Sequence, residues 1–217
     1  MTITLDTKSL GVVLKQVAGD LQGCAAELQE LDAQIGDGDL GVTAELAGKA
    51  MADFIDTTDS NELGLFLSRC GMAVNKASPS TFGTLLASGF LGAGKAIGKV
   101  QEIDEDDLVV MWSGAVEGIK NRGKAEVGDK TMLDSLVPGF EAFEKAMKAG
   151  GSVSESFSAA VEAAKAGMES TAGMKAKFGR ASWRQEATTE FRDGGAVAMY
   201  RIIESFARHL REYTENS

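Results

Sequence analysis

Three aspartates within eight residues are the side chains best suited to chemistry in this sequence. Asp32, Asp37 and Asp39 stand in the glycine-rich segment 31–41. Close carboxylates resist joint ionisation unless a cation compensates their charge. Hard oxygen donors suit Mg²⁺, which shares its coordination shell with substrate phosphates, and glycines let the backbone turn sharply beside a ligand. The segment therefore predicts a Mg²⁺ site for a phosphate-bearing ligand; the alternative is a solvated acidic turn that caps the next helix.

Two further segments combine glycine with hydroxyl side chains where a helix is about to begin. In residues 77–83, Ser78 and its neighbours could bind an anion at a helix N-terminus. In residues 128–132, either Thr131 or Asp129 could cap the helix that follows. A plain helix cap is also the alternative reading of residues 77–83.

The last two segments of this kind lie near the end of the chain. Arg180, within 179–182, could clamp phosphate oxygens or pair with a surface acid. Asp193 is well placed to cap the final helix, and Gly194 and Gly195 permit close approach of a ligand.

Helices must position these segments, because apolar residues recur at intervals of three and four along almost the whole chain. No stretch keeps a period of two, so strands are not expected. The predicted helices contain the apolar stripes 10–31, 42–54, 63–74, 82–97, 108–119, 133–147, 153–168 and 196–210.

Eight amphipathic helices joined by short connections favour an all-α fold, an antiparallel up-and-down bundle or closed barrel, with residues 1–217 as a single domain. The connection 171–192 is the exception, and connections of this length are commonly functional or mobile. The chain also has 26 glycines. Since glycine weakens helices, so many glycines predict either that helix backbones approach one another closely or that loops admit a ligand.

The composition excludes several classes of protein. A formal charge of −10 argues against nucleic-acid binding. No apolar run approaches the roughly 20 residues of a membrane span, and residues 1–6 lack the features of a signal peptide. We therefore expect a soluble cytoplasmic protein that binds neither nucleic acid nor membrane.

Taken together and in order, these segments resemble the L subunit of the dihydroxyacetone kinases, the nucleotide-binding family of the two-part glycerone kinases. The similarity runs over most of the chain. The motifs that carry it are Asp32 with 36–39, 78–83, 128–134, 179–182 and 193–196.

The resemblance implies an eight-helix antiparallel barrel whose loops at one end hold ADP or ATP. It implies two Mg²⁺ ions bound by Asp32, Asp37 and Asp39, with Arg180 joining these aspartates in catalysis. The residues that it places at the nucleotide are Leu40, Gly41, Val42, Thr43, Ser78, Pro79, Gly123, Thr131, Met132, Arg180, Asp193, Gly194 and Gly195.

The resemblance also implies partners. The sugar site would lie on a separate K subunit, which holds dihydroxyacetone, or a related small ketose such as erythrulose, through a histidine. The donor would be ATP, or bound ADP that a phosphohistidine protein of the phosphotransferase system rephosphorylates. One alternative is a non-catalytic Mg–ADP-binding module that regulates another protein; another is a barrel that holds lipid or nothing.

Three positions depart from the family pattern. Leu40 stands where histidine is usual, Pro79 where glycine is common, and Gly194 where proline is usual. The missing imidazole bears on the phosphoryl donor, the rate and nucleotide retention. Because the three aspartates are intact, we expect metal–nucleotide binding to survive these changes.

Overall fold

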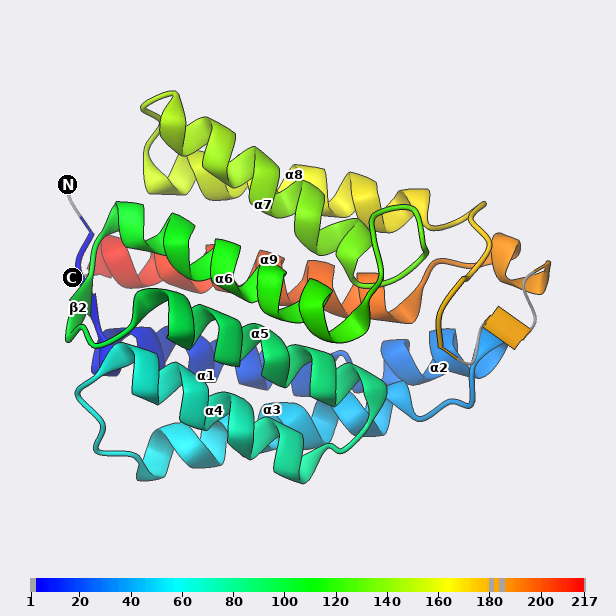
Figure 1. Ribbon diagram of the computed structural model, residues 1–217, viewed down its shortest axis with the longest axis horizontal. Coiled ribbons are helices and arrows are strands. Elements are labelled where there is room, and N and C mark those ends of the chain that lie inside the picture. The colour runs from blue at the N-terminus through cyan, green and yellow to red at the C-terminus, as the bar shows by residue number, and fades with distance from the viewer. Residues whose placement is uncertain (1–2, 180–181, 184–185, 217) are drawn as a thin grey trace.

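Long antiparallel helices make up most of the chain in the computed structural model (Figure 1). The structure describes residues 3–179, 182–183 and 186–216. The helices are α1 (Thr7–Gly23), α2 (Ala25–Ile35), α3 (Leu40–Thr57), α4 (Leu63–Ala77), α5 (Thr81–Ile97), α6 (Glu105–Gly123), α7 (Leu133–Lys148), α8 (Val153–Ser170), the 3₁₀ helix η2 (Ala187–Glu190) and α9 (Gly194–Asn216). Two short strands, β1 (Leu5–Asp6) and β2 (Glu102–Ile103), pair antiparallel, with Leu5 opposite Ile103.

The all-α fold class predicted from the sequence is confirmed, with two differences in detail. The stripe 10–31, predicted as one helix, divides at Cys24 into α1 and α2, so the described residues form nine α-helices. Leu21 and Leu28 belong to the same core cluster on either side of the division, so the apolar period continues across it. The two-residue strands were not predicted, because elements so short contain no periodic signal.

The helices close into a ring in which most neighbours in space are also neighbours in sequence. Helices α3, α4, α5, α6 and α7 pack in that order, α8 packs on α7 and α9, and α1 closes the ring between α9 and α3. Helix α2 lies at the end where α1 ends and α3 begins (Figure 1). We call this the carboxylate end, after residues 32–39, and we call the opposite end, with β1 and β2, the β end.

The core consists of two apolar clusters, one toward each end. The cluster toward the carboxylate end includes Leu40, Met132 and Ala196, which lie at or next to the starts of three helices. The cluster toward the β end contains aromatic rings with centroid separations between 4.5 and 5.7 Å. These rings are Trp112, Phe143, Phe157 and Phe206, and Trp112 also lies 6.0 Å from Phe140, which packs against the other cluster. An apolar cavity of about 160 Å³ touches both clusters.

Glycines allow neighbouring helices to approach closely, as their abundance predicted. A Cβ added to Gly92 on α5 would collide with the carbonyl oxygen of Gly114 on α6. A Cβ on Gly118 would collide with the carbonyl oxygen of Ser88 in the same way. The α5–α6 contact is therefore closer than any residue with a side chain would permit.

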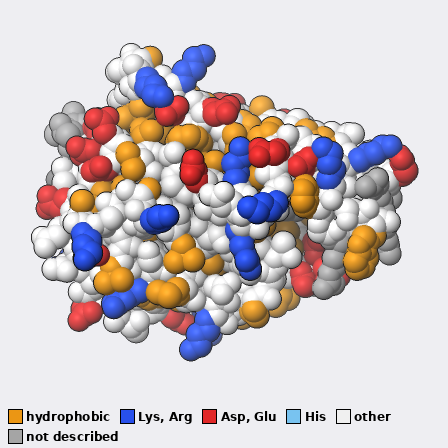
Figure 2. All heavy atoms as spheres, viewed as in Figure 1, with side chains coloured by type: hydrophobic (Ala, Val, Ile, Leu, Met, Phe, Trp, Pro, Cys, Tyr) orange, Lys and Arg blue, Asp and Glu red, His pale blue; other side chains and the backbone are white. Residues whose placement is uncertain are grey.

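Charged side chains of both signs are spread over the surface. Figure 2 shows one face, on which Lys and Arg side chains are dispersed among Asp and Glu rather than gathered into a basic patch. Among the described residues, no helix is both long enough and apolar enough to cross a membrane.

Candidate functional site

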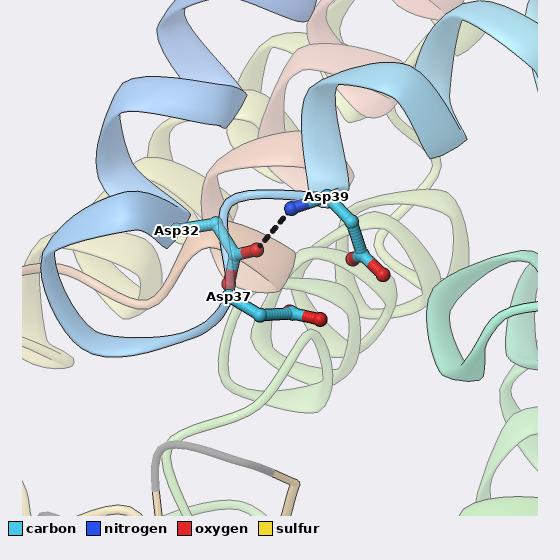
Figure 3. A group of neighbouring side chains, drawn as sticks. All are labelled: Asp32, Asp37 and Asp39. Atoms are coloured by element: carbon cyan, nitrogen blue, oxygen red, sulfur yellow. Dashed lines mark hydrogen bonds between the residues drawn. The ribbon is translucent and has the colours of Figure 1, made fainter.

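Asp32, Asp37 and Asp39 meet at the carboxylate end. Each offers a carboxylate oxygen, and these oxygens lie within 4.8 Å of one another (Figure 3). Asp32 is half-buried near the end of α2, whereas Asp37 and Asp39 are exposed. The structure therefore brings together the three side chains that the sequence predicted as metal ligands, and metal binding by them stays a prediction.

The loop between α2 and α3 turns tightly around Asp32. Its Oδ2 accepts hydrogen bonds from the backbone N–H groups of Asp39 (2.9 Å) and Leu40 (3.3 Å), as Figure 3 shows for the first. A Cβ on Gly36 would collide with Asp32 Oδ1, and Gly38 has φ +76°, in the left-handed region that favours glycine. Glycine at both positions lets the chain fold back on its own carboxylate.

The donor set of this cluster fits a divalent cation. Three carboxylates supply only oxygen atoms, which are the ligands that Mg²⁺ prefers. Like charges this close repel one another, and a cation would remove that cost. One oxygen of Asp32 is already occupied by backbone N–H groups, and its other oxygen remains to coordinate the cation.

The first turn of α3 lies directly against this cluster. It contains the predicted nucleotide-binding residues Leu40, Gly41, Val42 and Thr43, and the N-cap residue of this helix makes no side-chain cap of its own. A helix N-terminus presents N–H groups that have no partner within the helix, which favours an anion there. Val42 is 51% exposed, whereas Thr43 is buried.

The end of α4 supports that turn. The buried hydroxyl of Ser78 donates to the carbonyl oxygen of Thr43 at 3.2 Å. Ser80 caps α5 by accepting from the N–H of Gly83 at 3.0 Å, so the cap reading of this segment holds for Ser80. Pro79 is exposed between them.

The turn before α7 is held together by Asp134. This buried carboxylate accepts from the N–H groups of Gly128 (2.5 Å) and Thr131 (2.7 Å). The Thr131 hydroxyl accepts from the N–H of Leu133 at 3.2 Å, while Met132 occupies the N-cap position without a side-chain cap. The sequence assigned a cap to Thr131 or Asp129, but it did not single out Asp134.

The start of α9 joins these segments. A Cβ on Gly194 would lie 2.7 Å from Leu40 Cδ2, and a Cβ on Gly195 would lie 3.6 Å from the backbone nitrogen of Met132. Asp193 caps the helix, as predicted, by accepting from the N–H of Ala196 at 2.7 Å. The first turns of α3, α7 and α9 therefore converge beside the three aspartates.

Asp193 has a shifted pKa. Although the residue is only partly buried, burial of its carboxylate raises the pKa to about 6. The N–H of Ala196 and the charge of Lys130 oppose this shift, and the charges of Asp134 and Asp32 add to it. The carboxylate of Asp193 thus interacts electrostatically with Asp32, one of the three clustered aspartates.

Three of the described residues among those predicted, Gly123, Val42 and Pro79, are not tied to the cluster by these contacts. Gly123 is the last residue of α6, where a Cβ would lie 3.1 Å from Leu85 Cδ2. Val42 and Pro79 lie at the carboxylate end with exposed side chains. Arg180 lies outside the residues that the structure describes.

Two residues that the sequence gave no role have extensive contacts here. Lys130 is buried before α7, and its ammonium group donates to backbone carbonyls of the segment that joins α8 to α9. The hydroxyl of Thr171, at the end of α8, accepts from the N–H of Asp193 at 2.9 Å. No local pattern predicts either role, because each partner is distant in sequence.

Comparisons with known proteins agree with the resemblance seen in the sequence. The model of the DAK2 domain matches residues 34–208. The probable dihydroxyacetone kinase of Dictyostelium discoideum is 33% identical over 92% of this chain, which spans 33% of that protein. The ADP-binding subunit DhaL of the PEP-dependent dihydroxyacetone kinase 2 of Listeria innocua is 29% identical over 97% of this chain and 98% of its own length.

A solved structure shares the fold. The dihydroxyacetone kinase from C. freundii, in complex with AMP-PNP and Mg²⁺, superposes with a TM-score of 0.70 and 24% identity over 91% of this chain and 33% of that one. The chain thus spans about a third of two of these proteins and nearly all of the Listeria subunit. Because the domain model covers most of its length, and the ordered motifs agree with it, this chain belongs to the DAK2 domain family.

Proposed function

We propose that this chain is the ADP- and ATP-binding subunit of a two-part kinase that phosphorylates dihydroxyacetone or a related small ketose. Its partner is a K-type subunit that holds the sugar. The whole chain acts as one nucleotide-binding domain in the cytoplasm. The name of the Listeria relative, an ADP-binding subunit that matches along almost its entire length, supports this proposal.

The observation that carries the proposal is the cluster of three carboxylates beside converging helix N-termini. Asp32, Asp37 and Asp39 offer oxygen atoms within 4.8 Å of one another, which fits Mg²⁺. Next to them begin α3, α7 and α9, and the first turns of helices favour phosphate groups. A Mg–nucleotide needs both features in one place.

Phosphoryl transfer depends mainly on positioning and on neutralising the phosphate oxygens. Divalent cations, two in this proposal, supply that neutralisation when they are held by the three aspartates. Asp32 is fixed for this task by its hydrogen bonds from Asp39 and Leu40. The backbone N–H groups of Gly41 and Val42, in the first turn of α3, have no partner within the helix and donate to phosphate oxygens in this proposal.

The remaining predicted residues complete the nucleotide site in this proposal. Thr43 and Ser78 support the first turn of α3 through their mutual hydrogen bond. Thr131, Met132 and the segment 193–195 form the opposite side, and Gly123, Pro79 and Arg180 complete the site. Arg180 binds phosphate oxygens during transfer.

Isothermal calorimetry tests the binding half of the proposal. The chain is titrated with ADP and with ATP, each with and without Mg²⁺. We expect saturable binding that weakens by at least about tenfold without Mg²⁺, because the carboxylates then repel the phosphates. Absence of nucleotide binding in the presence of Mg²⁺ would contradict the proposal.

A coupled assay tests the catalytic half. The chain is mixed with a K subunit and dihydroxyacetone or erythrulose, and either ATP or a phosphohistidine protein supplies phosphate. Turnover with one donor identifies the scheme. Binding of Mg–ADP without turnover by any K subunit would instead favour a regulatory module. Leu40 bears on this alternative, because it removes the imidazole that the family usually has near the phosphates.

A further inference from the structure

Lys130 is an unusual residue at the carboxylate end because its side chain is almost completely buried. Only 1% of its surface is exposed, and its backbone has φ +61°, which side-chain-bearing residues rarely adopt. Lysines are almost never fully buried unless their charge is compensated. The burial therefore indicates a specific task for the ammonium group.

That group binds three points along one segment, the α8–α9 connection (residues 171–193). Its Nζ donates to the carbonyl oxygens of Thr171 (2.5 Å), Thr188 (2.8 Å) and Phe191 (2.6 Å). An ammonium group has three donors, so all of them are used. Thr171 lies at the start of the connection, and the other two lie toward its end. The side chain of Lys130 thus holds the start of the connection and its final part together.

The charge of Lys130 is partly compensated by its surroundings. Burial lowers the pKa of its ammonium group below its ordinary value, and the charges of Asp193 and Asp134 oppose that shift in part. Asp134 holds the turn that carries Lys130, through the N–H groups of Gly128 and Thr131. Asp193 is the last residue of the connection. The cation therefore lies between the turn and the connection that it contacts.

The position of the connection matters to the site because it leads directly into α9. Its last residue is followed by Gly194 and Gly195, which lie against Leu40 and Met132. We propose that Lys130 is a positioning residue that fastens the α8–α9 connection to the turn 128–134 and thereby sets the edge of the nucleotide site formed by 193–195. The part concerning the nucleotide rests on the proposed function.

Amide hydrogen exchange on the protein without nucleotide tests the fastening. The Gly173 N–H donates to the carbonyl oxygen of Thr189 at 2.9 Å, and the Ala176 N–H donates to the Thr188 hydroxyl at 3.2 Å. In Lys130→Met, which has a similar length and no charge, we expect both amides to lose protection by at least about tenfold. Amides of α1 and α6 are expected to keep theirs.

Calorimetry with Mg–ADP tests the consequence for the site. Lys130→Met is expected to bind Mg–ADP at least about tenfold more weakly at a temperature well below its melting point. The matched control is Lys175→Met, which removes an exposed lysine of the same connection that pairs with the exposed Glu186, also within the connection, at 2.5 Å. The control is expected to stay within about twofold of wild type in both measurements.

Should Lys130→Met not fold, Lys130→Arg gives the same test, because it keeps the charge but cannot reproduce the three bonds of an ammonium group. We expect intermediate losses in exchange protection and affinity. If the amides of Gly173 and Ala176 kept their wild-type protection from exchange in either folded variant, the proposal that Lys130 fastens the connection would be overturned. Equal loss of protection in α1 and α6 would overturn it as well, by showing a merely structural role.

Loss of protection with unchanged Mg–ADP affinity would overturn the link to the nucleotide site. If wild type itself binds no Mg–ADP, the proposed function and that link both fail. The exchange experiment contains no nucleotide, so it still decides whether Lys130 fastens the connection.

Discussion

The two ends of the bundle differ in how their helices begin. At the β end, α1, α6 and α8 start with capping boxes formed by Asp6, Asp104 and Ser152, each with the residue three positions on, whereas α4 starts without a side-chain cap. At the carboxylate end, Ser80 and Asp193 cap α5 and α9, but the N-cap residues of α3 and α7 make no side-chain cap. The N–H groups of Asp39 and Leu40, where α3 begins, bond instead to Asp32 in the preceding helix.

We relate this difference to two tasks, the stability of the fold at the β end and the binding of a ligand at the carboxylate end. A capping box satisfies two of the first N–H groups within the chain, so α3 and α7 keep more donors for a ligand than a helix that starts with a capping box. The β end also has the aromatic cluster, whereas the carboxylate end has close like charges. We infer that the β end stabilises the fold and that the carboxylate end gives up some stability for binding. Four substitutions test this comparison.

The largest effect is expected from Phe143→Ala in the aromatic cluster. Phe143 is fully buried, with its centroid 4.5 Å from Phe157 and 5.3 Å from Trp112. Its truncation is expected to lower the free energy of unfolding by about 3–5 kcal/mol, because it leaves a cavity. Urea denaturation measures this loss, and calorimetry is expected to show unchanged affinity for Mg–ADP. A matching loss of affinity would mean that the two ends are coupled.

Asp37→Asn is expected to have the opposite profile. It removes one charged ligand of the proposed metal site, so the affinity for Mg–ADP is expected to fall at least about 100-fold, or about 2.7 kcal/mol. The free energy of unfolding of the apo protein is expected to change far less than in Phe143→Ala, because Asp37 is exposed. Melting curves with and without Mg–ADP measure both effects. Asp59→Asn, an exposed acid of the α3–α4 connection, is the control that should change neither.

Asp193→Asn tests the pH response of the carboxylate end without ligand. Burial raises the pKa of Asp193 to about 6, above its ordinary value of 3.8. Its contribution to stability is therefore fully present below about pH 4 and is lost as the pH rises through about 6. Asparagine caps a helix equally well. Between about pH 4 and 7 we expect wild type to lose on the order of 1 kcal/mol relative to the variant in urea denaturation.

Asp6 at the β end responds with the opposite sign. Hydrogen bonds from the N–H and hydroxyl of Ser9 lower its pKa below 3.8. Its contribution is therefore present above about pH 4 and is lost as the pH falls through the folded pKa. For Asp193, the raised pKa would be refuted if the free energy of unfolding changed with pH in the same way in wild type and in Asp193→Asn.

The smallest effect is expected from Ser152→Ala. The Ser152 hydroxyl accepts from the N–H of Glu155 at 3.3 Å and donates to its carboxylate at 2.7 Å. Loss of this exposed cap is expected to cost about 1 kcal/mol of unfolding free energy. Binding of Mg–ADP should be unaffected. A measurable change in affinity would contradict the assignment of binding to the carboxylate end alone.

The sequence by itself determined the helices, the three aspartates and the family. Helical periodicity is local, since each stripe repeats every three or four residues. Asp32, Asp37 and Asp39 are close in sequence, so a tight turn brings them together with little help from the rest of the fold. For the same reason the cap at Asp193 was predictable.

Only the tertiary structure decided what surrounds those aspartates. The division at Cys24 is hidden because Leu21 and Leu28 face one core. The approach of Gly194 to Leu40 and the bonds of Lys130 to the α8–α9 connection join residues that are distant in sequence. Such contacts follow from how the helices pack around a shared core, and no spacing within a single segment contains that information.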